Sequence, residues 1–331
     1  MKANGVVFTA PSQVEYKQVN CPEPGPEDVV VRLTHSWISN GTEGSYLRGE
    51  RIDGDTPYRE GDPWPFPIIS GYQKVGVVEW IGDAVDDLEI GETVFALFGR
   101  VDGLFDARAG HISPTVTSRK QIWKLPKDVD PVAFSGLILT QVGYNSGTRG
   151  RIDIGEGAVV VGDGLVGQWT AQTLAWRGAK VALVGKHKDR LDRFGSGPNR
   201  ILINSNETDW KAAVQDIFPE GVQIAVDTVG SMDIMNGFFD VMKRDGHLVS
   251  AGFYGTADQI SLQPLRYKEL RIELPSGATG ERLDKTIDLI AAGYLQTLPL
   301  ITHHFPVQKA AEAWRLITEK SEPVLGVVLD W

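Results

Sequence analysis

Two patterns of apolar residues divide the chain. From Gly157 onward, short apolar runs alternate with segments whose apolar residues recur at helical spacing. The runs that predict strands are 158–161, 181–184, 201–203, 223–226, 248–251 and 270–274. The intervening helices are predicted to begin at Leu165, Asp189, Thr208 and Ser231. Repeated strand–helix–strand units form a parallel sheet with helices on both faces, so we expect a doubly wound α/β domain here.

The segment up to about residue 125 has a different character. Its β-branched runs 29–33, 75–79 and 93–96 are separated by turn signals rich in Gly and Pro, which is typical of a β-rich domain. Residues 44–67 show no periodicity. The tail returns to mixed character, with helical periodicity over 283–292 and 307–319 and a strand pattern over 324–329.

Length and composition narrow the class of protein. A chain of 331 residues suggests about two domains, and the net charge of −10 argues against a general nucleic-acid binder. No apolar run reaches the length of a membrane span, and the first residues lack a signal-peptide pattern. The single cysteine, Cys21, excludes a disulfide framework and a cysteine-rich zinc site. We therefore expect a cytoplasmic protein that acts on a small molecule.

A glycine-rich loop lies between the first of these strands and its helix. Its sequence is Gly162-Asp163-Gly164-Leu165-Val166-Gly167. In a dinucleotide-binding loop the first glycine permits a tight turn, the second admits a pyrophosphate, and the third permits close helix packing. The free N–H groups at the helix N-terminus then favour phosphate. The alternative is a glycine turn that binds nothing.

The end of the next strand indicates which dinucleotide is preferred. An NAD site normally has Asp or Glu there to hold the ribose 2′-hydroxyl, whereas this chain has Gly185. Lys186, His187 and Arg190 follow, and such cations suit a 2′-phosphate. The sequence therefore favours NADP(H), the alternative being that these cations are a solvated helix start.

Ordered motifs along nearly the whole chain resemble the medium-chain dehydrogenase/reductase superfamily. They are Ser39-Asn40-Gly41-Thr42-Glu43, Gly71-Tyr72-Gln73-Lys74-Val75-Gly76, Gly91-Glu92-Thr93-Val94, the glycine loop, Asp227-Thr228-Val229-Gly230 and Pro299-Leu300-Ile301-Thr302-His303. The resemblance implies a GroES-like β-barrel catalytic domain, residues 1–139 and 274–331, split around a Rossmann NADP(H)-binding domain, 140–273. It also implies an active site in the cleft between them and a homodimer formed through the edge strand 270–274.

The resemblance further suggests which residues meet the cofactor beyond the glycine loop. They are Thr140, Thr228, Val229, Ala251, Phe253 and Ser276. The alternative for each is an ordinary turn at a strand end.

The zinc ligands of the superfamily's alcohol dehydrogenases are missing from the matching motifs. The position of the ligating cysteine falls on Ser39 or Asn40, the histidine position on Tyr72, and the third ligand position near Ile138. The region 95–114, which would carry the structural zinc, has no cysteine. Zinc needs several convergent N, O or S ligands, so we expect neither zinc site. The local likeness is to a zinc-free branch that includes bacteriochlorophyllide hydroxyethyl dehydrogenases.

Without a metal, a hydroxyl or amide must stabilise charge on the substrate oxygen during hydride transfer. The candidates are Tyr72, Thr42, Asn40 and Ser39. Tyr72 is the first choice because a phenol can both donate and accept, the alternative being a packing tyrosine. We interpret Glu43 as a structural carboxylate that binds backbone N–H groups.

These observations favour a zinc-independent, NADP(H)-dependent oxidoreductase for an alcohol/carbonyl substrate. Trp64 and Phe66 lie among charged residues and could line a mouth for a hydroxylated or sugar-like substrate, the alternative being a solvent loop. Two other functions remain open. One is an NADPH-dependent enone or quinone C=C reductase, and the other is a non-catalytic NADPH-binding protein on the same fold.

Overall fold

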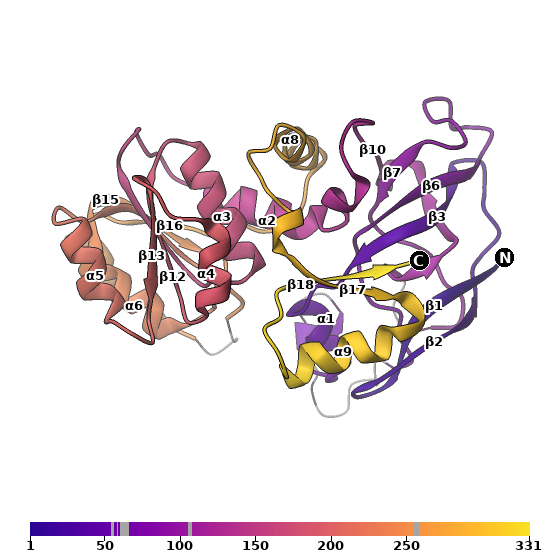
Figure 1. Cartoon of the computed structure of the whole chain (residues 1–331), viewed down its shortest axis with the longest axis horizontal. Coiled ribbons are helices and arrows are strands. Elements are labelled where there is room, and N and C mark those ends of the chain that lie inside the picture. The colour runs from indigo at the N-terminus through magenta and orange to yellow at the C-terminus, as the bar shows by residue number, and fades with distance from the viewer. Residues whose placement is uncertain (54–55, 58, 60–65, 105–107, 255–257) are drawn as a thin grey trace. The chain divides into compact units, whose positions relative to one another are not determined.

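The computed structural model describes residues 1–53, 56–57, 59, 66–104, 108–254 and 258–331. The chain divides into two compact units, 1–138 with 301–331 and 139–300 (Figure 1). Residues 274–300, which the sequence analysis assigns to the first domain, lie in the second unit. Hydrogen bonds tie this segment there, because Gln296 donates its N–H to Gln172 Oε1 at 2.8 Å and accepts from Trp169 Nε1 at 3.1 Å.

The first unit is built on antiparallel strands. Among the described residues, its larger sheet has the order β10 (Ile122–Lys124), β7 (Thr93–Ala96), β6 (Lys74–Ile81), β3 (Asp28–Trp37), β18 (Gly326–Asp330) and β17 (Ile301–Pro306), with β9 (Thr115–Ser118) paired to β3. A smaller sheet has the order β2 (Gln13–Asn20), β1 (Lys2–Ala10) and β8 (Ile112–Ser113), and β4 (Arg51–Asp53) pairs with β5 (Thr56–Pro57). The parallel pair β17–β18 is the exception to the antiparallel arrangement.

Short helices complete this unit. They are α1 (Thr42–Leu47), α9 (Ala310–Glu319) and the 3₁₀ turns Arg119–Gln121, Pro131–Phe134 and Val307–Lys309. Trp314 of α9 is 1% exposed and meets Phe8 edge-on, with ring centroids 5.2 Å apart. Tyr46 and Leu47 of α1 belong to the same buried cluster. This cluster fixes α1, and with it the Ser39–Glu43 motif, to the body of the unit.

The second unit confirms the predicted doubly wound α/β pattern. In the described part of the chain, its sheet has the order β13 (Arg200–Asn204), β12 (Lys180–Gly185), β11 (Gly157–Val161), β14 (Val222–Asp227), β15 (Met242–Ser250) and β16 (Arg271–Glu273). Every neighbouring pair is parallel. The helices are α2 (Leu137–Gly147), α3 (Leu165–Trp176), α4 (Lys188–Phe194), α5 (Trp210–Ile217), α6 (Met232–Val241), α7 (Leu262–Tyr267) and α8 (Gly280–Ala291), with a 3₁₀ turn at Leu298–Leu300.

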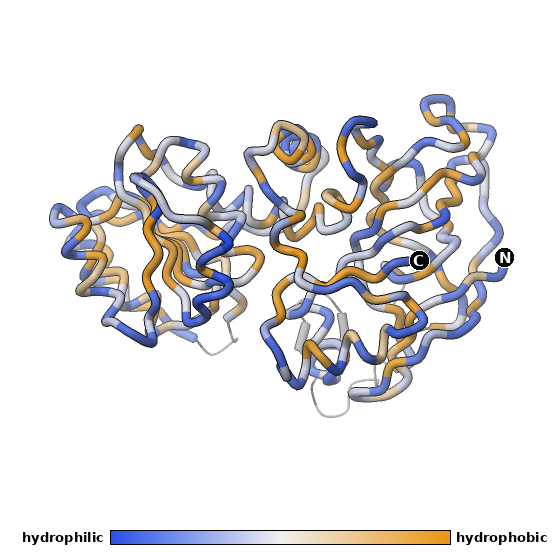
Figure 2. Tube along the Cα trace, viewed as in Figure 1, coloured by the Kyte–Doolittle hydropathy of each residue, from blue (hydrophilic) through white to orange (hydrophobic). Residues whose placement is uncertain are grey.

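Both faces of this sheet are buried, as a parallel sheet requires. Along β11, Val159 and Val161 belong to one apolar cluster, while Ala158 and Val160 belong to another. Figure 2 shows these central strands as an apolar band. At the edge, β16 exposes Ile272 by 37%, and Leu274 beyond it by 74%. The homodimer expected from this edge stays a prediction.

Two features of the first unit differ from the sequence expectations. The stretch 44–67 lacks periodicity, yet it begins with α1 and contains the β4–β5 pair. Trp64 lies outside the described residues, and Phe66 packs against the core cluster around Trp314.

Over the residues described, no helix has the length and apolar character needed to cross a membrane.

Candidate functional site

The glycine loop joins β11 to α3 in the geometry that dinucleotide binding requires. Gly162 has φ of 120°, which an L side chain rarely adopts, and a Cβ on Gly167 would lie 1.9 Å from the carbonyl oxygen of Gly162. Gly164 is the N-cap of α3, and a Cβ added there would meet nothing within 4 Å. The helix N-terminus therefore faces open space with its N–H groups available to a pyrophosphate. Leu165 and Val166 begin the helix behind it.

Neighbouring strands contribute three of the predicted cofactor residues to the same edge of the sheet. Thr228 follows β14, donates its hydroxyl to Val161 O at 3.0 Å, and would contact a Cβ on Gly162. Val229 is 54% exposed, and its N–H bonds to the carboxylate of Asp227 at 2.7 Å. Ala251 is tied to the same place by a bond from its N–H to Asp227 O at 2.9 Å. The carboxyl ends of parallel strands are where such sheets bind ligands.

Phe253 lies at the same edge, because it follows β15, is 54% exposed, and its carbonyl oxygen would be 2.1 Å from a Cβ on Gly230. The other two predicted cofactor residues belong to other segments of this unit. Thr140 is fully buried within α2. Ser276 is exposed, and its carbonyl oxygen accepts from Arg282 at 3.3 Å. Their roles toward a cofactor stay predictions.

Asp163 has a position that the sequence analysis missed. Its carboxylate accepts the N–H groups of Lys186 and His187, each at 2.8 Å. It also pairs with His187 Nδ1 at 3.0 Å and with Arg190 at 3.4 Å. A Cβ on Gly185 would lie 2.4 Å from Asp163 Oδ2. The loop carboxylate thus occupies the space next to Gly185 where an NAD site normally has its acid, and two of the expected free cations are already paired.

In the first unit, Tyr72, which takes the motif position expected for a zinc-ligating histidine, forms a hydroxyl pair with Ser39, one of the two candidates for the cysteine position. Tyr72 donates its hydroxyl to Ser39 Oγ at 2.6 Å. Burial raises the pKa of Tyr72 to about 12, with a smaller contribution in the same direction from the charge of Glu43 and opposing hydrogen bonds to Ser39 and Thr42. The phenol therefore remains a proton donor throughout the neutral range.

Asn40, the fourth catalytic candidate, is held by the residue that immediately precedes β18. Its Nδ2 donates to Leu325 O at 2.8 Å. The Oδ1 of the same amide is buried and has no hydrogen-bond partner within the described part of the chain. Asn40 therefore anchors the loop that carries Ser39 and Thr42.

A buried acid and imidazole lie beneath the hydroxyl pair. Glu43 accepts the Ser39 N–H at 2.8 Å and the Ser70 hydroxyl at 2.9 Å. Its Oε2 lies 2.8 Å from His111 Nε2, and the two side chains are 1% and 0% exposed. The sequence interpretation of Glu43 as a carboxylate that binds backbone agrees with the first contact. The partnership with His111 could not be seen in the sequence, because the two residues are far apart along the chain.

These residues do not fit a zinc ion. The expected ligand positions fall on the neutral hydroxyl of Tyr72 and on either the hydroxyl of Ser39 or the amide of Asn40, whereas protein zinc sites use thiolate, imidazole or carboxylate. Glu43 and His111 already bond to each other. Among the residues described, no group of three or more His, Cys, Asp or Glu side chains is arranged to hold a metal. No step of the mechanism below uses a metal.

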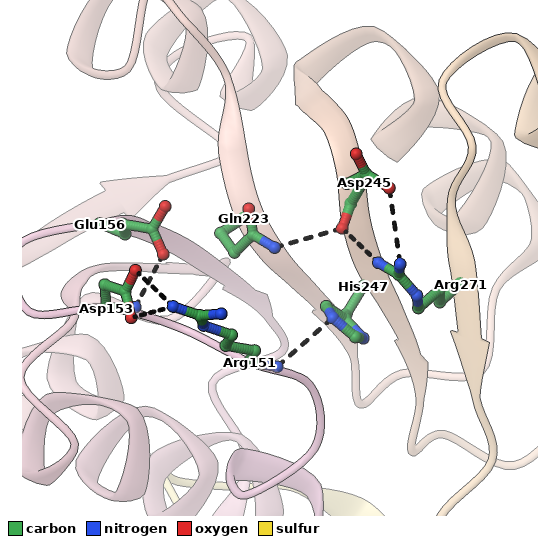
Figure 3. Close-up of a pocket in the computed structure, with 7 residues that line it drawn as sticks. All are labelled: Arg151, Asp153, Glu156, Gln223, Asp245, His247 and Arg271. Atoms are coloured by element: carbon green, nitrogen blue, oxygen red, sulfur yellow. Dashed lines mark hydrogen bonds and ion pairs between the residues drawn. The ribbon is translucent and has the colours of Figure 1, made fainter.

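A surface pocket in the second unit lies away from the glycine loop (Figure 3). It is lined by Arg151, Asp153, Glu156, Gln223, Asp245, His247 and Arg271. Gln223 lies near the amino end of β14, so this pocket belongs to the edge of the sheet opposite the loop. Arg151 pairs with Asp153 at 3.4 Å, and Arg271 pairs with Asp245 at 3.5 Å. Because it lies at the opposite edge of the sheet from the glycine loop, the pocket is not part of the candidate cofactor site.

Comparison with known proteins identifies relatives of the whole chain. Residues 166–292 match the family model described as zinc-binding dehydrogenase. The 2-desacetyl-2-hydroxyethyl bacteriochlorophyllide A dehydrogenase of Cereibacter sphaeroides is 26% identical over 346 residues, which cover 100% of this chain and 99% of that protein. The sequence analysis found this likeness in local motifs, and the comparison extends it along the full length.

Solved structures share the fold at lower identity. The alcohol dehydrogenase TADH from Thermus sp. ATN1 superposes with a TM-score of 0.83 at 21% identity, covering 99% of each chain. An alcohol dehydrogenase of Escherichia coli CFT073, complexed with NADH, superposes with a TM-score of 0.85 at 20% identity, covering 100% of this chain and 99% of that one. Residues 166–292 therefore match a zinc-binding dehydrogenase domain, and the whole chain resembles dehydrogenases in sequence and alcohol dehydrogenases in fold.

Proposed function

We propose that this oxidoreductase transfers a hydride between NADP(H) and an alcohol/carbonyl substrate without zinc, with Tyr72 as the proton donor. The observation that carries the proposal is the hydroxyl pair formed by Tyr72, at the motif position expected for the zinc-ligating histidine, and Ser39, one of the two candidates for the cysteine position. The glycine loop supports dinucleotide binding, because Gly164 leaves open space at the N-terminus of α3.

A bound nicotinamide would supply or accept the hydride. In the direction of reduction, the Tyr72 hydroxyl turns its single hydrogen from Ser39 Oγ to the carbonyl oxygen and transfers that proton as the oxygen gains charge. Ser39 Oγ lies 2.6 Å from the phenol oxygen and is the group that can return a proton to it. In alcohol oxidation the same atoms exchange the proton in the opposite direction.

The substrate class follows from the same hydroxyls. A pair of neutral donors suits a small substrate that carries several hydroxyl groups, and we propose a hydroxylated or sugar-like substrate on this basis. One relative covering 98% of this chain at 23% identity is named L-galactonate-5-dehydrogenase, from Escherichia coli.

The test is nicotinamide absorbance across a substrate panel. NADP⁺ is offered with polyols, sugar acids and simple alcohols, and NADPH with ketones, sugars and enones. We expect turnover of matched alcohol and ketone partners. Turnover of enones alone would replace the proposal with C=C reduction, and binding of NADPH without any turnover would favour a non-catalytic protein.

Cofactor preference is tested by binding, independently of turnover. The proposal of NADP(H) rests on Gly185, which brings no carboxylate of its own, and on the exposed Lys186. Lys186→Ala should weaken NADPH binding about tenfold by removing a charged partner of the 2′-phosphate, and should leave NADH binding unchanged. The matched control is Lys188→Ala, because that lysine pairs with Asp192 at 2.7 Å. Equal losses for both dinucleotides in Lys186→Ala would contradict the assignment.

Asp163→Asn tests the same cofactor preference by removing a negative charge that should oppose the 2′-phosphate. Removal of the carboxylate charge releases His187 and Arg190 from their ion pairs, while the amide oxygen can still accept a backbone N–H. NADPH should then bind several-fold tighter relative to NADH, as isothermal titration would measure. A shift toward NADH would mean that the carboxylate does not oppose a 2′-phosphate.

A further inference from the structure

A line of buried hydrogen bonds runs from Trp331 to Glu43. The indole Nε1 of Trp331 donates to Ser36 Oγ at 2.8 Å. Ser36 Oγ lies 2.8 Å from His111 Nδ1, and His111 Nε2 lies 2.8 Å from Glu43 Oε2. Ser36, Glu43 and His111 are each 0% exposed. Water therefore does not determine where the protons in this line reside.

The donor at one end limits where the protons of this line can reside. An indole N–H can only donate, so Ser36 Oγ accepts from Trp331. The other partner of this hydroxyl in the described part of the chain is His111 Nδ1, so the serine hydrogen has an acceptor only when Nδ1 is unprotonated. The imidazole then carries its hydrogen on Nε2 and donates it to Glu43. Every group is satisfied with a neutral His111. An imidazolium would present a second donor to Ser36 and leave the serine hydrogen without its acceptor.

Glu43 is thus surrounded by neutral donors. They are the Ser39 N–H at 2.8 Å, the Ser70 hydroxyl at 2.9 Å and the neutral imidazole of His111 at 2.8 Å. Three hydrogen bonds stabilise an ionised carboxylate even when it is buried. We propose that Glu43 is a positioning residue, ionised and without a counter-cation among the described residues, whose bond to the Ser39 N–H holds that serine against the Tyr72 phenol.

The consequence for catalysis rests on the function proposed above. The groups that face the Tyr72 phenol are the hydroxyls of Ser39 and Thr42, the phenol of Tyr46 and the carboxylate of Glu43. Of these, Glu43 is the group that is charged at neutral pH. Its charge and the burial of the ring both raise the pKa of Tyr72, to about 12. Loss of the charge should therefore make the phenol easier to ionise.

The experiment is an NMR titration that needs neither substrate nor cofactor. The chain is labelled with ¹³Cζ-tyrosine, and the Tyr72 resonance is assigned by its loss in Tyr72→Phe. The pH is raised from 7 to the highest value at which the fold persists. In the unmodified protein Tyr72 should remain protonated to about pH 11, whereas in Glu43→Gln its midpoint should fall by about one unit.

A second variant separates charge from hydrogen bonding. Ser70→Ala removes one donor to the same carboxylate but keeps its charge, so the Tyr72 midpoint should stay within about 0.3 unit of the unmodified value. A midpoint that is unchanged in Glu43→Gln, or lowered equally in both variants, would overturn the proposal.

A measurement on the unmodified chain guards against a variant that fails to fold. With ¹⁵N-histidine, the His111 signals, assigned by their loss in His111→Gln, should show the neutral Nε2–H tautomer at pH 7. An imidazolium there would overturn the proposal, because Glu43 would then have a counter-cation. If no member of the substrate panel is turned over but the Tyr72 midpoint shifts as expected in Glu43→Gln, the proposed function is contradicted and the charge of Glu43 is still established.

Discussion

Tyr72→Phe should lower kcat for carbonyl reduction by about 10²- to 10⁴-fold, with a much smaller change in KM. The substitution removes the hydroxyl that lies 2.6 Å from Ser39 Oγ and keeps the ring that fills the site. Loss of a proton donor affects the transition state, in which oxygen gains charge, more than the bound substrate. Steady-state kinetics with saturating NADPH and the ketone found by the panel would measure both parameters.

The control is the same chemical change at an exposed tyrosine. Tyr294 is 55% exposed in the second unit, and its ring packs near Trp176. Tyr294→Phe should retain the unmodified kcat. If Tyr72→Phe also retains it, Tyr72 is a packing residue and the proton comes from another group.

Because the donor form of Tyr72 is lost only as pH rises toward about 12, reduction should show no alkaline loss attributable to this residue below about pH 10.

The second large effect is expected in the glycine loop, where two similar substitutions should have different outcomes. Gly167→Ala places a methyl group 1.9 Å from a backbone oxygen, so the loop or α3 must shift. Such overpacking costs about 1–3 kcal/mol or more and lowers Tm, and NADPH and NADH should both lose binding. Gly164→Ala meets nothing within 4 Å, so its effect on Tm should be no larger than that of a poorer helix cap.

Gly164→Ala nevertheless should weaken both dinucleotides by at least about tenfold, because its methyl group enters the space where a pyrophosphate approaches the helix. Gly280→Ala is the control, since that glycine lies at the start of α8 and a Cβ there also meets nothing within 4 Å. It should change neither Tm nor binding appreciably. Unimpaired binding in Gly164→Ala would show that the pyrophosphate does not lie at this helix N-terminus.

The second unit could be predicted from the sequence because its signals are local. The apolar run at 158–161 and the glycines at 162, 164 and 167 specify a strand, a turn and a helix within a few residues. The structure has β11 at Gly157–Val161 and α3 at Leu165–Trp176. The β1–β2 hairpin was missed because β2 is largely exposed and has few apolar residues to mark it.

The contacts of the candidate site, by contrast, join residues that are far apart in the sequence. Asp163 reaches the space beside Gly185 on the next strand, and His111 reaches Glu43 from another part of the first unit. Neither residue type is unusual at its own position, so only folding brings the partners together. Family motifs in the sequence indicated the candidate hydroxyls Tyr72 and Ser39, but the sequence could not identify the buried groups that lie beneath them.

The return of the chain to its first unit has a consequence for the order of folding. Strand β18 pairs with β3, so that Val328 lies opposite Trp37, and α9 supplies Trp314 to the core around Phe8. During synthesis, residues 139–300 are complete and contiguous before residues 301–331 emerge, so the second unit can fold first. Until then β3 lacks β18, and the exposed strand edge and open core are sites where nascent chains can associate wrongly. The first 138 residues are therefore the segment that must wait for the last-made part of the chain before its sheet and core are complete.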